Sequence, residues 1–228
     1  MKTKTLLIAA AALAAGVMSS QAQGVYSQNI VGYVNLSISN GFNLVNIPLD
    51  LDGTGTNNVV TTVIGTNLPN GSIIESWTPT GGFTPNTFGT TPKNPTPHWT
   101  TPTATYNPGQ GIFVYNPSNT VVNLTIVGTV LQGGLTNSYI DSAGFSLVGG
   151  QFPVAGGIST TFGYTPDDGD IAESWSPTAG FTPNTFGPTP KIPTPHWTSG
   201  EPQLTVGQGI FIFTTNTAPV WGTNFEVQ

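Results

Sequence analysis

The segment Glu75–Thr100 reads ESWTPTGGFTPNTFGTTPKNPTPHWT, and Glu173–Thr198 reads ESWSPTAGFTPNTFGPTPKIPTPHWT. The two segments align without a gap, 98 residues apart, and differ only at positions 78, 81, 90 and 94 of the first. Self-similarity at a fixed spacing is the signature of an internal repeat. The sequence therefore predicts two copies of one structural unit.

The similarity extends on both sides of this duplicated block. Downstream, GQGIF at Gly109–Phe113 recurs at Gly207–Phe211 with the same spacing of 98 residues. Upstream, GFNLV at Gly41–Val45 matches GFSLV at Gly144–Val148 with a spacing of 103 residues. The first copy therefore carries five extra residues, which we place between Asp50 and Asn70.

The junction between the copies has no linker composition. It reads TVVNLTIVGTVLQGG, a β-branched run without the Pro, Ser or charge enrichment of a flexible linker. We place the first repeat at 23–126 and the second at 127–228, joined through a shared or continuous strand.

Composition favours an all-β fold. After the N-terminal segment, Pro and Gly interrupt every candidate helix, and short apolar runs such as GIFVY and GIFIF lie between turn residues. Both alternating faces of these two runs are apolar, so they are expected to be central strands. We predict two tandem repeats of sandwich-like or partly closed barrel form, preceded by an N-terminal signal helix.

Residues 1–22 have the three parts of a secretory signal peptide. Lys2 and Lys4 precede the apolar run Leu6–Met18, and the small-residue site ending at Ala22 follows. The apolar run is too short for a permanent membrane anchor, and no later run reaches the roughly 20 apolar residues of a transmembrane helix. The mature protein is predicted to be secreted, extracellular or associated with the cell envelope.

The charge balance argues against nucleic acid and anionic membranes as partners. Without residues 1–22, two lysines (Lys93 and Lys191) oppose ten carboxylates, a formal charge of 2 − 10 = −8, and the chain has no arginine. Phosphate backbones and anionic lipids are bound by several cationic side chains. A charged fraction of 6% favours self-association or contact with a matrix. We expect a strand at Thr223–Val227 to offer a sheet edge for such self-association.

The duplicated block supplies the candidate ligand-binding residues. Flat aromatic rings with nearby polar groups suit stacking on sugars or on another protein, and two copies would give bivalence. The alternative is that these aromatic side chains form the core of each repeat. The candidates are Trp77, Phe83, Asn86, Phe88, His98 and Trp99 in the first copy and Trp175, Phe181, Asn184, Phe186, His196 and Trp197 in the second.

No catalytic constellation is recognisable. Each block has a single carboxylate, Glu75 or Glu173, whereas a glycosidase uses a pair. We expect these carboxylates to accept hydrogen bonds from backbone or lysine groups. His98 and His196 have no nucleophile elbow to accompany them and are interpreted as structural. We predict that the protein is not an enzyme; a hydrolase of unfamiliar design is the weakest alternative.

No cofactor or metal is expected. The chain has no cysteine, and neither block clusters His with Asp or Glu. The acidic turns Asp50–Gly55 and Asp167–Asp170 do not complete a calcium-binding pattern. Asp168-Gly169-Asp170 aligns with Asn70-Gly71-Ser72 of the first copy, so both are expected to be tight turns with a positive φ.

The order of segments resembles a family of uncharacterised secreted β-repeat proteins of Gram-negative environmental bacteria. The resemblance lies in VYSQNIVGYVNLSISNGFNLVNIPL, PGQGIFVYNP, VGTVLQGGLTN with GFSLVGGQFPVAGG, and the ending TAPVWGTNFEVQ. It implies an exported β-rich module from a Gram-negative bacterium and brings no known activity. The Pro-Thr-rich block with Pro-His-Trp departs from that pattern. We expect a non-catalytic structural or interaction protein of the cell surface or extracellular matrix, with bivalent glycan binding as the alternative.

Overall fold

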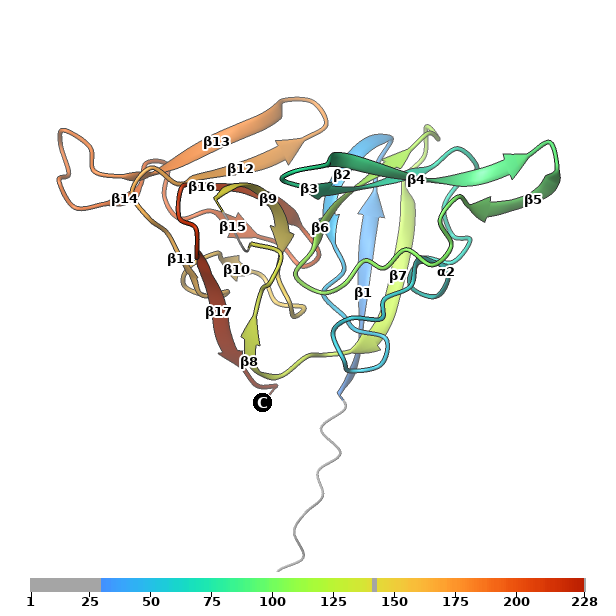
Figure 1. Ribbon diagram of the computed structural model, residues 1–228, viewed down its shortest axis with the longest axis horizontal. Coiled ribbons are helices and arrows are strands. Elements are labelled where there is room, and N and C mark those ends of the chain that lie inside the picture. The colour runs from blue at the N-terminus through green and yellow to red at the C-terminus, as the bar shows by residue number, and fades with distance from the viewer. Residues whose placement is uncertain (1–29, 141–142, 228) are drawn as a thin grey trace, which may run out of the picture.

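The computed structural model describes residues 30–140 and 143–227, and the expected signal peptide lies outside this range. The described chain is all-β, as predicted, with one short helical turn, α2 (Val60–Val63). Each of its five sheets has two edge strands, so in the described ranges none closes into a barrel. Figure 1 shows the sheets side by side in one body.

Two five-stranded antiparallel sheets have the same strand order. The first consists, from edge to edge, of β2 (Gly41–Asn46), β6 (Gly111–Asn116), β3 (Ile73–Thr78), β4 (Gly82–Thr91) and β5 (Asn94–Trp99). The second consists of β9 (Gly144–Gly149), β16 (Gly209–Thr214), β12 (Ile171–Ser176), β13 (Gly180–Gly187) and β14 (His196–Trp197). Each strand of one sheet occupies the position of its sequence counterpart in the other. The two repeats thus have equivalent sheets, and the runs expected to be central, now β6 and β16, are inner strands.

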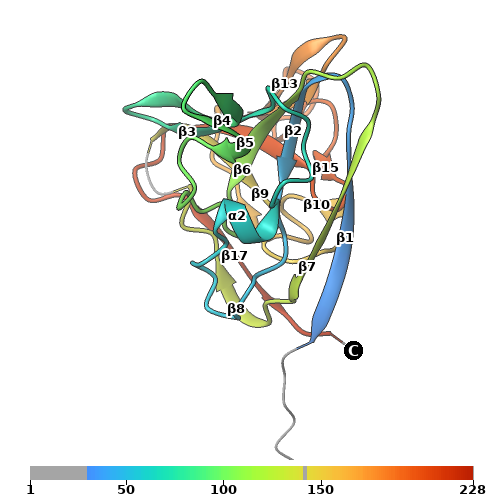
Figure 2. The ribbon, with the colours of Figure 1, turned by 90° about the vertical axis from the view of Figure 1, so that its right-hand side faces the viewer.

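Three smaller sheets complete the fold. Their strands are β1 (Val31–Ile38) with β7 (Val122–Thr129), β10 (Gly156–Gly157) with β15 (Gln203–Leu204), and β17 (Val220–Phe225) between β11 (Tyr164–Thr165) and β8 (Gly133–Thr136). The ribbon of β1 and β7 runs along one side of the molecule (Figure 2). The boundary placed between residues 126 and 127 falls inside β7, which pairs with β1 along its whole length. β17 lies between β11 and β8, but β11 pairs only with Val220 and Trp221, and the predicted edge segment pairs with β8 alone, through Thr223–Phe225.

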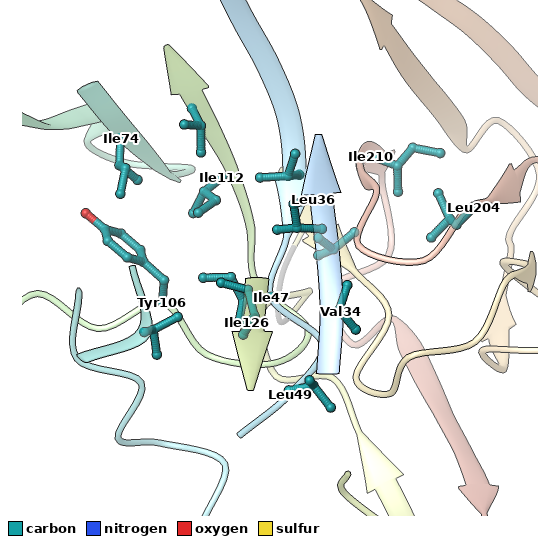
Figure 3. Close-up of a cluster of buried hydrophobic side chains, with 14 of the residues drawn as sticks. Val34, Leu36, Ile47, Leu49, Ile74, Tyr106, Ile112, Ile126, Leu204 and Ile210 are labelled. Carbon is teal, nitrogen blue, oxygen red and sulfur yellow. The ribbon is translucent and has the colours of Figure 1, made fainter. Parts of the chain in front are cut away.

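One continuous hydrophobic core joins the two repeats. Alternation along β1 buries Val34, Leu36 and Ile38, and the opposing strand β7 buries Leu124 and Ile126 in the same way. Figure 3 shows residues of both copies in this cluster: Val34, Leu36, Ile47, Leu49, Ile74, Tyr106, Ile112, Ile126, Leu204 and Ile210. The repeats are therefore packed as one unit.

The repeats also meet through a reciprocal pair of backbone hydrogen bonds. The Asn46 amide donates to the Gly207 carbonyl at 2.8 Å, and the Gly149 amide donates to the Gly109 carbonyl at 3.0 Å. Asn46 corresponds to Gly149 and Gly109 corresponds to Gly207, so the two bonds are related by an approximate twofold axis. The edge strands β2 and β9 lie next to this axis.

The first glycine of the repeated Gly-Gln-Gly sequence allows the two backbones to approach closely enough for these hydrogen bonds. Gly109 and Gly207 have φ values of 89° and 77°, in the left-handed region that favours glycine. A Cβ atom on Gly207 would lie 2.2 Å from the Leu36 side chain. The prediction that these segments are turns rather than phosphate loops agrees with their position before β6 and β16.

Candidate functional site

The structure divides the duplicated block into two groups of side chains. Along the β3–β4 hairpin, Trp77 pairs with Phe83 near the tip, while Phe88 pairs with Trp99 of β5 at the base. The second copy repeats this division, with Trp175 opposite Phe181 and Phe186 opposite Trp197. The residues predicted as one binding surface therefore lie in two different environments.

The base group belongs to the core. Phe88 and Trp99 are 3% and 2% exposed, and the Trp99 indole N–H donates to the Gly65 carbonyl at 2.8 Å. In the second copy Trp197 is buried and Phe186 is half-buried. This half of the block matches the core interpretation.

Each of the two asparagines of the block hydrogen-bonds the loop that follows the block: Asn86 bonds the loop after β5, and Asn184 bonds the loop after β14. The Asn86 side chain donates to the Thr101 carbonyl at 3.0 Å and accepts from the Thr101 amide at 2.8 Å. Asn184 does the same with the Gly200 carbonyl at 2.7 Å and the Ser199 amide at 3.0 Å. Their amides are engaged in these backbone contacts at the base of each hairpin.

The two histidines are half-buried and contact their own loops. His98 Nδ1 lies 2.9 Å from the Thr96 carbonyl, and His196 Nδ1 lies 2.9 Å from the Thr194 carbonyl. In residues 30–140 and 143–227, no group of three or more His, Asp or Glu side chains is placed to hold a metal ion.

The tip group forms an aromatic surface across the approximate twofold axis, which we call the aromatic platform. Its members are Phe42, Trp77, Phe83, Phe113, Phe145, Trp175, Phe181 and Phe211. The hairpin tips of β3–β4 and β12–β13 approach one another above β6 and β16 (Figure 1). Phe83 and Phe181 are the most exposed members, at 42% and 43%.

Reciprocal contacts hold the platform together. The Trp77 indole N–H donates to the Phe145 carbonyl of the other repeat at 2.9 Å, and the Trp175 N–H donates to the Phe42 carbonyl at 3.0 Å. Trp77 packs edge-to-face on Phe83 with ring centroids 4.8 Å apart, and Trp175 packs on Phe181 at the same separation. Edge-to-face pairs at 4.5–7 Å are favourable beyond the area they bury. The rings are thus fixed in position before any ligand arrives.

Two shallow depressions lie on the platform and are equivalent by the repeat. The first, about 180 Å³, is lined by Trp77, Phe83, Phe145, Glu173, Phe181 and Phe211. The second, about 160 Å³, is lined by Trp175, Phe181, Phe42, Glu75, Phe83 and Phe113. Each depression therefore combines five aromatic side chains with one carboxylate.

The two carboxylates have no partner within the described chain. Glu75 and Glu173 are half-buried, yet neither accepts a hydrogen bond nor pairs with a cation among the residues that the structure describes. The expectation that they accept backbone or lysine hydrogen bonds is therefore wrong for this part of the chain. β-register explains their position: Glu75 lies opposite Phe113, and Glu173 lies opposite Phe211.

A more polar groove lies beside Trp175. It has a volume of about 360 Å³, and its lining includes Asn35, Ser37, Asn43, Thr205 and Gln208. β1 contributes the first two of these residues. This groove places amides and hydroxyls next to one tryptophan of the platform.

Four platform residues were not among the predicted site residues: Phe42, Phe113, Phe145 and Phe211. The available signal was the doubly apolar character of their strands, which requires a second covered face. That face is covered by the other repeat, a pairing that no single strand sequence specifies.

The acidic turns are stabilised internally. Asp52 accepts from the Thr54 amide, the Thr54 hydroxyl and the Asn57 side chain at 3.0, 2.6 and 2.7 Å. These bonds lower the pKa of Asp52 to about 2. In the other turn, buried Asp170 accepts from the Tyr164 hydroxyl and the Asp167 amide.

The predicted tight turns are confirmed. Gly71 and Gly169 have φ values of 92° and 93°, as expected for Asn70-Gly71-Ser72 and Asp168-Gly169-Asp170.

Comparisons with known proteins give no related site. No protein-family model, curated protein or solved structure matches the chain. The resemblance to secreted β-repeat proteins of Gram-negative bacteria stays a prediction. In the part of the chain that the structure describes, no helix has the length and apolar character needed to span a bilayer.

Proposed function

We propose that the chain is an exported, non-catalytic structural and interaction protein of the cell surface or extracellular matrix. In this proposal two tandem sandwich-like repeats act together to present the aromatic platform as their binding surface. The observation that carries it is the exposure of Phe83 and Phe181, 42% and 43%, above two fixed tryptophans.

The make-up of the platform supports binding. Aromatic side chains are enriched at protein interfaces, and contiguous exposed apolar patches commonly mark interaction sites. The rings of Phe83 and Phe181 each contact both Phe113 and Phe211, so the exposed surface is continuous across the two repeats. A rigid, preassembled surface loses little conformational entropy on binding.

The sequence supports the compartment. Residues 1–22 have the form of a secretory signal. Only 6% of the residues of the full chain are charged. Such a surface repels copies of itself weakly and favours a matrix or another chain as partner.

The proposal is tested by the double variant Phe83→Ser/Phe181→Ser. Sedimentation at increasing concentration measures self-association, and retention on immobilised polysaccharides measures matrix binding. We expect the wild type to associate or be retained and the variant to lose this behaviour.

The matched control is Val121→Ser/Ile192→Ser, which removes two apolar side chains that are 57% and 50% exposed outside the platform. It should behave like the wild type, and thermal unfolding should show that both variants are folded. A wild type that stays monomeric and is retained on nothing contradicts the proposal, as does a platform variant that still binds.

Bivalent glycan binding is the second candidate function, and the polar groove beside Trp175 favours one of its two sites. Sugar sites combine a stacking ring with hydrogen-bonding amides and hydroxyls. On a glycan array, Trp175→Ala alone should abolish binding if the groove is the site. Equal losses from Trp77→Ala and Trp175→Ala would assign binding to the platform instead, and silence of the wild type would reject the glycan function.

A further inference from the structure

The two unpaired carboxylates on the platform indicate the class of ligand it takes. Glu75 and Glu173 have neither a cation nor a hydrogen-bond donor as partner within the described ranges, and each lines an aromatic depression. Their oxygens are accessible to solvent, so each carboxylate is available to a ligand that enters the depression beside it. The same arrangement occurs twice, at equivalent positions of the two repeats.

Aromatic faces and a carboxylate attract the same kind of group. The negative face of Trp or Phe attracts a cation within about 6 Å of the ring, and this attraction is the basis of quaternary ammonium recognition. The carboxylate adds a direct charge interaction. An anionic ligand would be repelled by Glu75 and Glu173, and a neutral ligand could gain only a hydrogen bond to them and no charge interaction.

The apolar lining selects among cations. Five of the six side chains that line each depression are aromatic, so a cation must exchange most of its water for ring contacts. A compact primary ammonium is strongly hydrated, whereas an alkylated ammonium group carries its charge on a methylated, apolar surface. The lining therefore fits the alkylated group better.

The two lysines in the described part of the chain are placed elsewhere. Lys93 lies in the turn between β4 and β5, and Lys191 lies between β13 and β14, at the outer ends of the two sheets (Figure 1). The platform lies between those ends. Within the described ranges neither lysine is placed to pair with Glu75 or Glu173, and the acidic chain attracts a cationic ligand to them.

We infer that the two depressions are a pair of equivalent sites for alkylated ammonium groups, one bounded by Glu75 and the other by Glu173. This inference rests on the proposed function, because it names the ligand class of the same aromatic platform. Two sites on one rigid surface also favour ligands that carry several such groups, through a high effective concentration of the second group.

Choline and its neutral carbon isostere, 3,3-dimethylbutan-1-ol, provide a direct test. The purified protein is titrated with each, and binding is followed by the change in its tryptophan fluorescence, to which Trp77 and Trp175 of the platform contribute. We expect choline to bind about two- to fivefold more tightly than the isostere, the range of a cation–aromatic contact. This preference should weaken as salt concentration rises.

The variant Glu75→Gln/Glu173→Gln should lose most of the preference while still binding both probes weakly. The control Asp168→Asn/Glu226→Gln removes the same number of charges from exposed positions outside the depressions and should keep the preference. The preference would then depend on the two platform carboxylates and not on net charge.

Equal affinity for choline and the isostere, or a preference that survives Glu75→Gln/Glu173→Gln, overturns the inference. If Phe83→Ser/Phe181→Ser still abolishes association or polysaccharide retention, the platform remains a binding surface with a different ligand. If that variant binds as the wild type does, the proposed function fails, whatever the choline titration shows.

Discussion

The two copies of the duplicated block have almost the same sequence and quite different surroundings. In the first copy Phe88 and Asn86 are buried, whereas their counterparts Phe186 and Asn184 are only partly covered. β5 extends over six residues, whereas β14 has two. The comparison shows that neighbouring segments, and not the block itself, determine how firmly each hairpin is held.

The hydrogen bonding of the base tryptophans is one part of the difference. In the first copy the Gly65 carbonyl, which follows α2, accepts the Trp99 indole N–H. In the second copy the Trp197 indole nitrogen is buried with no hydrogen-bond partner among the described residues. The counterpart of Gly65 is Gly163, whose carbonyl accepts the Gly222 amide of β17 at 3.2 Å instead.

A single substitution inside the block is a second cause. The Thr90 amide donates to the Asn70 side chain at 3.1 Å, and β4 continues to Thr91. The counterpart of Thr90 is Pro188, which has no N–H to donate, and β13 ends at Gly187. The shorter second hairpin follows from this loss of a donor.

The largest expected effect comes from removing the base tryptophans. Trp99→Ala and Trp197→Ala should each lower the free energy of unfolding by about 3–5 kcal/mol, because a large core ring leaves a cavity. Trp99→Ala should cost more, since it also leaves the Gly65 carbonyl without its donor. Denaturant unfolding followed by far-ultraviolet circular dichroism measures both. A folded protein of unchanged stability would refute the core role of these residues.

The next largest difference between the repeats is expected from alanine substitution of their equivalent asparagines, which should lower the free energy of unfolding by different amounts. Asn86→Ala removes buried bonds to Thr101 and Tyr106 and should cost about 2–3 kcal/mol. Asn184→Ala removes bonds at a more exposed site and should cost about 1 kcal/mol. The same unfolding measurement decides, and equal costs would mean that burial does not distinguish the two hairpins.

Alkaline pH should lower the stability of the protein through the ionisation of two buried tyrosines. Burial and then the Asp170 carboxylate raise the pKa of Tyr164, while burial raises the pKa of Tyr106, opposed by its bond to Asn86. A folded pKa above the unfolded value means stability is fully present below pH 10 and falls as pH rises above it. Tyr164→Phe should flatten this fall more than Tyr106→Phe in unfolding curves between pH 9 and about 11. Identical unfolding curves for both variants would show that Asp170 does not add to the alkaline loss of stability through Tyr164.

The smallest expected effect is in acid, through the exposed loop of the first repeat. Hydrogen bonds from Thr54 and Asn57 lower the pKa of Asp52 from 3.8 to about 2. A depressed pKa gives stability that is present above pH 3.8 and is lost as pH falls toward 2. Asp52→Asn should therefore reduce the slope of melting temperature against pH within that window and leave it unchanged above. A slope that does not change would exclude Asp52 as its source.

Much of the fold could be predicted because it depends on local pattern. Apolar residues on both faces of GIFVY and GIFIF identified two inner strands, and Asn70-Gly71 and Asp168-Gly169 identified two tight turns. The unequal spacings of 98 and 103 residues indicated a five-residue insertion in the first copy, and it lies before α2, between Asn46 and Val59. Each of these features is determined by neighbouring residues or by the comparison of one copy with the other.

The candidate site was less accessible because it depends on contacts between distant segments. Trp77 and Trp99 lie in the same block, yet only Trp77 meets the other repeat, through the Phe145 carbonyl. The position of the two copies around their axis decides this, and no periodicity encodes it. For the same reason Phe113 and Phe211 were expected as strand residues and not as part of the platform.

The reciprocal bonds from Trp77 to Phe145 and from Trp175 to Phe42 have a consequence for the origin of the molecule. Contacts that are related by a twofold axis can form equally well between two identical chains, as in an isologous dimer. Joining two such chains in tandem makes the contact independent of protein concentration. Fusion also frees each half to change separately, and the Thr90 and Pro188 hairpins show that divergence away from the shared axis.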